Sequence, residues 1–306
     1  MYSRITIVAL FFCITQFQLE AFSAPISFQW AGKLMVIKAT VNGQLGNFIL
    51  DTGTSHLVLN DQYFKGKRTD KIFHGMNGQT GTIQEDFVKV DIGQHRWKSA
   101  YAEIIPLAHL EKIKGLPIHG LIGGKMFRSY AMWIDCSTQE IGLQKIGKQS
   151  LSPGFYPQET DLEVQYFRYK ENSPCIQLQI GEHSLLFSLD TGAETNLIDQ
   201  KYESLLADYY NLSRKRHLNS FSPDRQTLNT TKLYDMKLGP FSCQPMNTIF
   251  TSLSKWNTST SGPKVAGILG YEFLHQFRIS INFKEREICF APTTPSTGLP
   301  QYTTKK

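Results

Sequence analysis

The chain has 306 residues and a formal net charge of +6 at pH 7. Hydrophobic residues make up 41% of it and charged residues 19%, a composition typical of a folded soluble protein, which excludes a disordered chain. The basic residues are scattered and are not interleaved with aromatic residues, so we expect no nucleic-acid partner. This length has room for two domains, each with its own hydrophobic core.

The N-terminus has the pattern of a targeting segment. Arg4 precedes an apolar run over residues 5–14, and small residues near position 23 offer a cleavage site. The sequence therefore predicts a signal peptide over 1–23 and a secreted or periplasmic protein. Because the apolar run is about half the length that spans a bilayer, we expect no stable membrane insertion after the signal is removed.

The first half opens with a predicted hairpin. Residues 35–41 alternate between apolar and polar, Asn42-Gly43 is a strong turn signal, and residues 44–50 lead to Asp51. An apolar strand thus carries a carboxylate towards the interior. A buried carboxylate is costly unless it is hydrogen-bonded, protonated or used chemically.

Further strands complete the first half. FVKVDIG (87–93) predicts a strand, and Gly-Leu-Ile-Gly (120–123) precedes a short helix and a closing strand. The polar stretch with Pro and Gly that follows predicts a connector, which we place at 148–160. The first lobe then spans residues 24–147.

The second half repeats this order. SLLFSL (184–189) leads to Asp190, LYDMKLG (233–239) predicts a strand, and Gly-Ile-Leu-Gly (267–270) precedes a short helix and a closing strand. We therefore predict a second lobe over residues 161–290.

Helix is scarce in both halves. Asp199 can cap a helix in which apolar and aromatic side chains recur at helical spacing as far as Tyr209. The C-terminal residues 291–306 are rich in Pro and Thr, which predicts a disordered tail.

The two halves align as an internal duplication. Asp51-Thr52-Gly53 matches Asp190-Thr191-Gly192 without a gap at an offset of 139 residues (190 − 51), and residues 120–143 match 267–290 at an offset of 147 (267 − 120). Two matches in the same order predict two similar lobes. We therefore expect an all-β fold of two β-barrel lobes related by a pseudo-two-fold axis, with few short helices.

Such an axis would bring Asp51 and Asp190 together. Two carboxylates a few ångströms apart cannot both ionise, so the pair holds one proton. One aspartate can then activate a water while the other protonates a carbonyl oxygen, which suits amide hydrolysis without a metal. We expect Thr52 and Thr191 to hydrogen-bond across the axis, and Gly53 and Gly192 to let backbone N–H groups approach the carboxylates.

At these residues the chain resembles a bilobal aspartic protease. DTGTS (51–55) is similar to the first-lobe motif of pepsins, and DTGAE (190–194) is closer to the retropepsin form. Leu121-Ile122-Gly123 and Ile268-Leu269-Gly270 match the segments that pass behind the DTG loops in this family. The resemblance covers about residues 28–290. It implies a peptide or protein substrate bound between two lobes under a hairpin flap, and a monomer, because one chain carries both aspartates.

The two DTG motifs differ at the position that follows them. Thr54 can donate a hydroxyl hydrogen bond to Asp51, which favours the charged carboxylate, whereas Ala193 cannot do so for Asp190. The expected flap lies within residues 76–84, where Asn77-Gly78 stands in place of the family's tyrosine. The candidate flap residues are Asn77, Gly78, Thr80 and Gly81.

Other chemistries have little support in the sequence. It contains no G-x-S-x-G elbow, zincin helix, P-loop or dinucleotide fingerprint, and the eight histidines have no paired spacing. We expect no cofactor and no metal. A peptide-binding or inhibitor protein on the same fold is the alternative, although both aspartates are retained. Four cysteines remain after signal removal and allow three pairings, none of which the sequence favours: Cys136, Cys175, Cys243 and Cys289.

Overall fold

The structure is a computed structural model, and the residues it describes are 24–74, 80–147, 162–215, 229–258 and 262–293. The predicted signal peptide and connector lie outside these ranges, as do residues 294–306 of the predicted tail. Within the described ranges the chain is mostly β, as the duplication predicts, with only short helices. None of those helices is long and apolar enough to cross a membrane.

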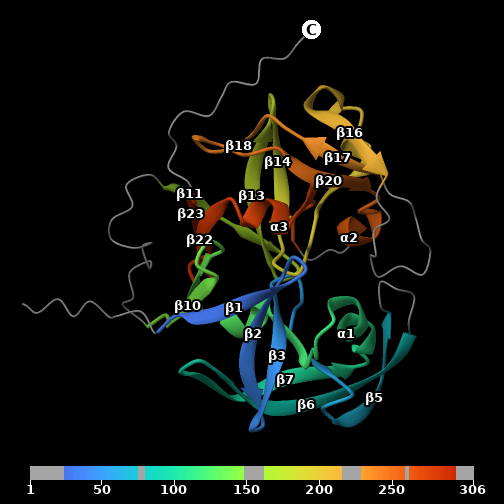
Figure 1. Ribbon diagram of the computed structural model, residues 1–306, viewed down its shortest axis with the longest axis vertical. Coiled ribbons are helices and arrows are strands. Elements are labelled where there is room, and N and C mark those ends of the chain that lie inside the picture. Colours follow the sequence, from blue (N-terminus) through green and yellow to red (C-terminus); the bar gives the residue numbers. More distant parts are fainter. Residues whose placement is uncertain (1–23, 75–79, 148–161, 216–228, 259–261, 294–306) are drawn as a thin grey trace, which may run out of the picture.

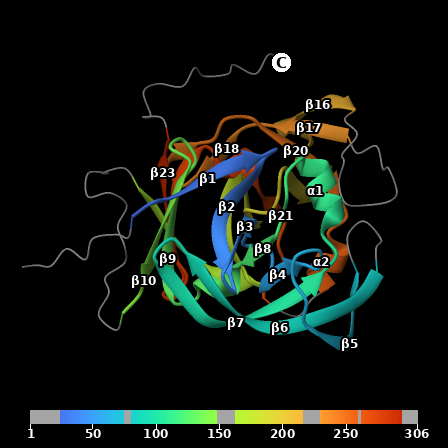
Figure 2. The ribbon, with the colours of Figure 1, turned by 60° about the horizontal axis from the view of Figure 1, so that its bottom comes forward.

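The first lobe contains the hairpin that leads to Asp51 and a long, curved pair of strands. Figure 1 shows this lobe in blue to green at the bottom, and Figure 2 shows its strands β6 and β7 curving below β2, β3 and β4. Its elements are β1 (Ile26–Ala31), β2 (Leu34–Val41), β3 (Gln44–Asp51), β4 (Leu57–Asn60), β5 (Lys67–His74), β6 (Thr80–Ile92), β7 (His95–Ile105), α1 (Ala108–Lys114), β8 (Gly120–Gly123), the 3-10 helix η1 (Gly124–Phe127), β9 (Tyr130–Asp135) and β10 (Glu140–Lys145).

The second lobe repeats this order with shorter strands and lies at the top of Figure 1. Its elements are β11 (Glu163–Tyr166), β12 (Arg168–Lys170), β13 (Ser173–Ile180), β14 (His183–Leu189), β15 (Asn196–Asp199), η2 (Gln200–Tyr202), η3 (Ala207–Tyr209), β16 (Tyr210–Lys215), β17 (Asn229–Leu233), β18 (Met236–Leu238), β19 (Phe241–Ser242), β20 (Met246–Thr251), α2 (Ser254–Thr258), β21 (Gly267–Leu269), α3 (Tyr271–Leu274), β22 (Phe277–Asn282) and β23 (Glu287–Pro292).

Strand pairing is the same in both lobes. In the first, β8 lies between β3, to which it is parallel, and β4, to which it is antiparallel; in the second, β21 lies between β14 and β15 in the same senses. This insertion pairs Asp51 with Gly123. The apolar-apolar-Gly segments therefore lie directly beside the strands that carry the two aspartates.

The lobes share a six-stranded antiparallel sheet in the order β11-β23-β22-β9-β10-β1. At its centre Trp133 of β9 pairs with Ser280 of β22. These residues are 147 positions apart (280 − 133), which is the offset of the second repeat, so Trp133 pairs with its own equivalent. Such self-pairing requires a two-fold relation between the repeats.

Apolar side chains fill both lobes and continue under the shared sheet. Phe48 and Phe187, which precede the two aspartates, are 0% and 1% exposed. The rings of Phe127 and Phe283 lie 6.1 Å apart, between the short helix of the first lobe and the end of β22. The two strands that end at the aspartates are thus anchored in one continuous core.

Three sequence predictions are corrected. The segment after Asp199 forms two 3-10 turns, η2 and η3, in place of a longer helix; Leu206 is its one fully buried residue and the chain turns into β16 at Tyr210. The expected strand 233–239 is interrupted at Asp235, whose φ of 54° ends β17 and begins a separate β18. The predicted start of the C-terminal tail at residue 291 is too early, because Ala291 still pairs within β23 and is 2% exposed.

The four cysteines are free thiols, so none of the three possible pairings occurs. Burial raises the pKa of each thiol, to about 12 for Cys136 and Cys243 and to about 11 for Cys175 and Cys289. Because the thiolate is the reactive form, these groups are structural and unreactive.

Candidate active site

Two equivalent loops meet where the lobes touch. Asp51 is the last residue of β3, and Asp190 directly follows β14. Backbone bonds to the inserted strands fix both positions: Asp51 pairs with Gly123 of β8, and the Asp190 N–H donates to the Leu269 carbonyl of β21 at 2.9 Å. The duplicated strand pairing therefore carries both carboxyl groups to the axis between the lobes.

Thr52 and Thr191 join the loops by reciprocal hydrogen bonds. The Thr52 N–H donates to Thr191 Oγ1 at 2.9 Å, and the Thr191 N–H donates to Thr52 Oγ1 at 3.1 Å. Each hydroxyl in turn donates across the axis, Thr52 to the Leu189 carbonyl at 3.2 Å and Thr191 to the Leu50 carbonyl at 2.8 Å. Both threonines are almost fully buried, so these four bonds are shielded from water.

Each glycine of the DTG motifs lies against the carboxyl group of the opposite loop. A Cβ atom on Gly53 would lie 2.4 Å from Asp190 Oδ2, and one on Gly192 would lie 2.5 Å from Asp51 Cγ. The N–H groups of Gly53 and Gly192 both donate to Asp190 Oδ1, at 3.1 and 2.8 Å. Only glycine permits this approach, which brings the two carboxyl groups together.

The two aspartates have different hydrogen-bond donors. The Thr54 N–H donates to Asp51 Oδ1 at 3.0 Å, and its hydroxyl donates to Asp51 Oδ2 at 2.8 Å. At the equivalent position of the second lobe, Ala193 has no side-chain donor, and its N–H bonds the Asp190 backbone carbonyl at 3.3 Å. The Thr54 hydroxyl therefore favours a charged Asp51, whereas the donors that favour a charged Asp190 are the backbone N–H groups of Gly53 and Gly192.

Burial raises the pKa of both carboxyl groups, but the other influences on the two pKa values differ. The hydrogen bonds from Thr54 oppose the rise in the pKa of Asp51. The pKa of Asp190 is raised further by the negative charge of Asp51, and the two carboxyl groups are hydrogen-bonded to each other. Two carboxyl groups that interact this strongly titrate as a unit, and the causes of the two shifts favour the proton on Asp190 and the charge on Asp51. A carboxylate beside a carboxylic acid can act as base and acid on one substrate.

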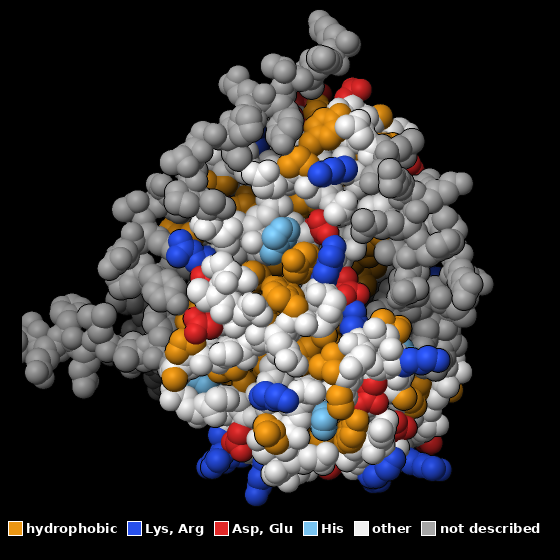
Figure 3. All heavy atoms as spheres, viewed as in Figure 1, with side chains coloured by type: hydrophobic (Ala, Val, Ile, Leu, Met, Phe, Trp, Pro, Cys, Tyr) orange, Lys and Arg blue, Asp and Glu red, His pale blue; other side chains and the backbone are white. Residues whose placement is uncertain are grey.

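Contacts that the sequence analysis missed brace both loops from the opposite lobe. Glu194 accepts from the Lys33 N–H at 3.0 Å and forms an ion pair of 2.6 Å with Lys114, whose side chain is 5% exposed. Lys33 also pairs through its side chain with Glu272. Figure 3 shows basic and acidic side chains alternating near the middle of the face that it draws.

The other loop is braced at the positions related by the duplication. Asn172, 139 positions after Lys33, donates its side-chain amide to the hydroxyl of Ser55, and Ser173 Oγ donates to the Thr52 carbonyl at 3.1 Å. Ser55 is in turn equivalent to Glu194. Extending the 139-residue alignment upstream would have paired Lys33 with Asn172, but no motif marks either residue.

The expected flap is only partly described. Asn77 and Gly78 lie outside the described residues. Thr80 and Gly81 open β6 and pair with His74 and Phe73 of β5, so they lie on one arm of a hairpin.

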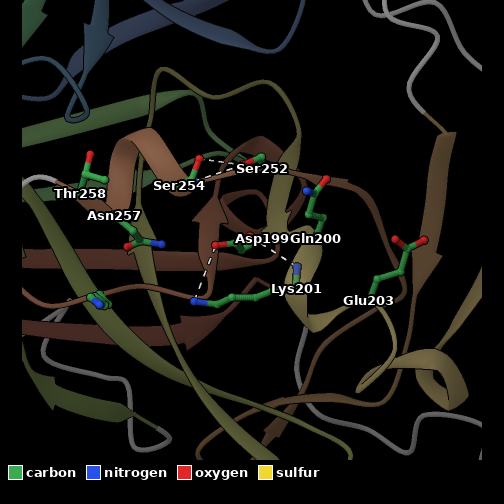
Figure 4. A pocket seen from close by; sticks show the side chains of 9 residues that line it. Asp199, Gln200, Lys201, Glu203, Ser252, Ser254, Asn257 and Thr258 are labelled. Atoms are coloured by element: carbon green, nitrogen blue, oxygen red, sulfur yellow. Dashed lines mark hydrogen bonds and ion pairs between the residues drawn. The ribbon is translucent and has the colours of Figure 1, made fainter.

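A separate polar pocket of about 720 Å³ lies in the second lobe and contains neither aspartate of the pair (Figure 4). Its walls include Asp199 and Lys201, which form an ion pair of 3.7 Å, and Ser252, whose hydroxyl bonds that of Ser254. In the described part of the chain, no group of three or more His, Cys, Asp or Glu residues could hold a metal ion.

Part of the chain matches a known protein family. Residues 37–126 match the family described as aspartyl protease, a stretch that runs from β2 to η1 and includes Asp51 and Gly123. This match supports an aspartyl protease; it does not extend to Asp190. A search of curated proteins found no match.

We predict that Thr52→Val and Thr191→Val each lower the free energy of unfolding by about 1–3 kcal/mol, because each leaves a buried N–H without its acceptor. Each variant removes two different bonds, but all four bonds hold the same pair of loops together. The double variant should therefore lose less than the sum of the two single losses. Urea denaturation measures all three. Thr138→Val is the matched control, because Thr138 is exposed, and it should change stability by less than about 0.5 kcal/mol. Fully additive losses would contradict the coupling.

Proposed function

We propose that this protein is an aspartic endopeptidase that hydrolyses peptide bonds with a water activated by Asp51 and Asp190. The observation that carries the proposal is the pair of half-buried carboxyl groups that the bonded threonines and the two DTG glycines hold beside each other. The aspartyl protease match over residues 37–126 supports it independently.

In the proposed reaction Asp51 is the base and Asp190 the acid. Asp51 takes a proton from water as the water oxygen bonds to the peptide carbonyl carbon, and Asp190 gives its proton to the carbonyl oxygen. The resulting gem-diol collapses as the C–N bond breaks, one proton moves to the leaving nitrogen, and the second returns to the pair. The aspartates end the cycle with one proton, as they began, and no covalent enzyme intermediate is needed.

The backbone around the aspartates supports these roles. Thr54 holds Asp51 with two hydrogen bonds, which orient the carboxylate that accepts the proton. The glycine N–H groups fix one oxygen of Asp190 and leave the other available for the shared proton. This preorganisation is what a general acid and base need at the reacting atoms.

We propose further that the enzyme acts as a monomer in a secreted or periplasmic setting. Because one chain supplies both aspartates, no second copy is needed to complete the site. Sedimentation velocity at the assay concentration should show active monomer; activity confined to a dimer would refute this part of the proposal.

We predict that Asp51→Asn and Asp190→Asn each lower kcat/KM on casein by a factor of roughly 10²–10⁴, because the reaction needs both the acid and the base. Each variant should remain folded by circular dichroism, and a statine-type peptide inhibitor should block the unmodified protein. Asp235→Asn is the matched control, since that residue is exposed and Asn tolerates its φ of 54°. Substantial activity in either site variant would reject the mechanism and favour a peptide-binding protein.

We predict that Ala193→Thr moves the basic limb of the pH–rate profile to lower pH. Without a donor at Ala193 the shared proton is held to higher pH, and we expect maximal activity at about pH 5–6.5. A threonine hydroxyl would favour the charged form of Asp190 and lower its pKa by about one unit, so the proton would leave at lower pH.

Ala193→Val is the control for that experiment, because it adds similar bulk without a hydroxyl. Its basic limb should stay close to that of the unmodified protein. The explanation would be disproved if a crystal structure showed the new threonine bonded to Asp190 while the basic limb stayed in place or moved to higher pH.

A further inference from the structure

A second pocket, of about 450 Å³, lies in the first lobe where the beginning of β7, η1 and the end of β10 meet His56. No aspartate or glutamate is among the described residues that line it. Its cationic lining consists of Arg96, Lys98, Lys125, Arg128 and Lys145. A concave surface lined by one sign of charge concentrates ligands of the opposite sign.

Much of this positive charge is not neutralised by neighbours. Arg96 is paired with Asp91 at 2.6 Å, and Arg128 lies over the ring of Tyr169 at 3.8 Å. No ion pair with a described carboxylate involves the remaining three cations, Lys98, Lys125 and Lys145. Burial and then the charge of Lys125 lower the pKa of His56, although Glu103 acts in the opposite direction.

The pocket is physically joined to the loop that carries Asp51. The Lys125 N–H donates to the Ser55 carbonyl at 3.1 Å, and Lys125 Nζ lies 3.2 Å from His56 Nε2. His56 follows Asp51 by five residues, so its backbone lies within about 18 Å of the aspartate even if the chain is fully extended. A substrate in extended conformation covers that distance in about five residues.

The position of the second lobe that is equivalent to Lys125 carries the opposite charge, and this charge is neutralised. Lys125 corresponds to Glu272 by the 147-residue offset, and Ser55 corresponds to Glu194. Glu272 pairs with Lys33, and Glu194 pairs with Lys114. The pseudo-two-fold axis therefore relates the region around Lys125, which has cations without an ion pair, to the region around Glu272, where the charges are paired.

We infer that the basic pocket receives an acidic side chain of the substrate, so that the enzyme favours peptides with Asp or Glu within about five residues of the cut bond, on one side only. This inference rests on the proposed endopeptidase function. A peptide has a direction, and it therefore matches a basic pocket that is joined to the loop of Asp51, while the equivalent charges beside the loop of Asp190 are paired. A free inorganic anion is the competing occupant.

The test compares peptides that differ by one charge. Starting from a peptide that the protein cleaves, Glu and Gln versions are made at each of five positions on both sides of the cut bond. At low ionic strength we expect kcat/KM to be roughly three- to ten-fold higher for Glu at one or two adjacent positions on one side, and the gain to shrink as salt is added.

A double variant, Lys125→Gln with Lys145→Gln, tests whether the preference for Glu comes from the pocket or from the net charge of the protein. Its Glu/Gln ratio should fall to near one. The matched control is Lys232→Gln with Lys237→Gln, two exposed lysines of the second lobe, and it should keep the ratio of the unmodified protein. Both pairs of substitutions remove the same net charge.

Several outcomes would overturn the inference. These are equal rates for Glu and Gln peptides at every position, a Glu preference on both sides, and a preference that survives in the Lys125/Lys145 variant. Inorganic phosphate that changes the rate of a Gln peptide, without any Glu preference, would identify a free-anion site. If neither peptide is cleaved and the protein behaves as Asp51→Asn does, the endopeptidase proposal fails. Fluorescence anisotropy of labelled Glu and Gln peptides then tests the pocket alone, with equal binding overturning it.

Discussion

The reciprocal hydrogen bonds between Thr52 and Thr191 are the interaction on which the rest of the structure depends. They tie together two loops that lie 139 positions apart in the sequence (191 − 52) and that end strands of different lobes. This link opposes the repulsion between two carboxyl groups that are held close together in a half-buried site. The same alignment of the lobes is maintained by three other features. These are the shared sheet, the inserted strands β8 and β21, and the cross-lobe contacts of Lys33 and Asn172.

The duplication makes the two lobes similar, and the proposed chemistry depends on a few positions at which they differ. Thr54 donates to Asp51 while Ala193 offers Asp190 no hydroxyl, and this difference favours the charge on Asp51 and the proton on Asp190. The same divergence is found farther from the axis, where Lys125 faces an open basic pocket and its equivalent Glu272 is paired with Lys33. A peptide has a direction, so a site with two different ends can bind it in one orientation.

Sequence reasoning located what local patterns encode. The repeated DTG motif predicted the contact between Thr52 and Thr191, and the Asn42-Gly43 dipeptide predicted a turn in which both residues have positive φ. Sequence reasoning overestimated the helix after Asp199, because apolar spacing cannot tell that only Leu206 needs burial. It missed the cross-lobe partners of Glu194, since lysines at positions 33 and 114 acquire meaning only when the lobes pack. The flap stays a prediction, because Asn77 and Gly78 lie outside the described residues.

The central claim, that the two carboxyl groups share one proton, can be measured by a ¹³C NMR titration of aspartate-labelled protein. Comparison with Asp51→Asn and Asp190→Asn assigns the two carboxyl signals. The structure predicts two widely separated apparent pKa values, with the higher one well above that of an ordinary aspartate and belonging mainly to Asp190, and loss of the separation in either variant. Two carboxyl groups that titrate together, near the ordinary value of about 3.9, would contradict the account.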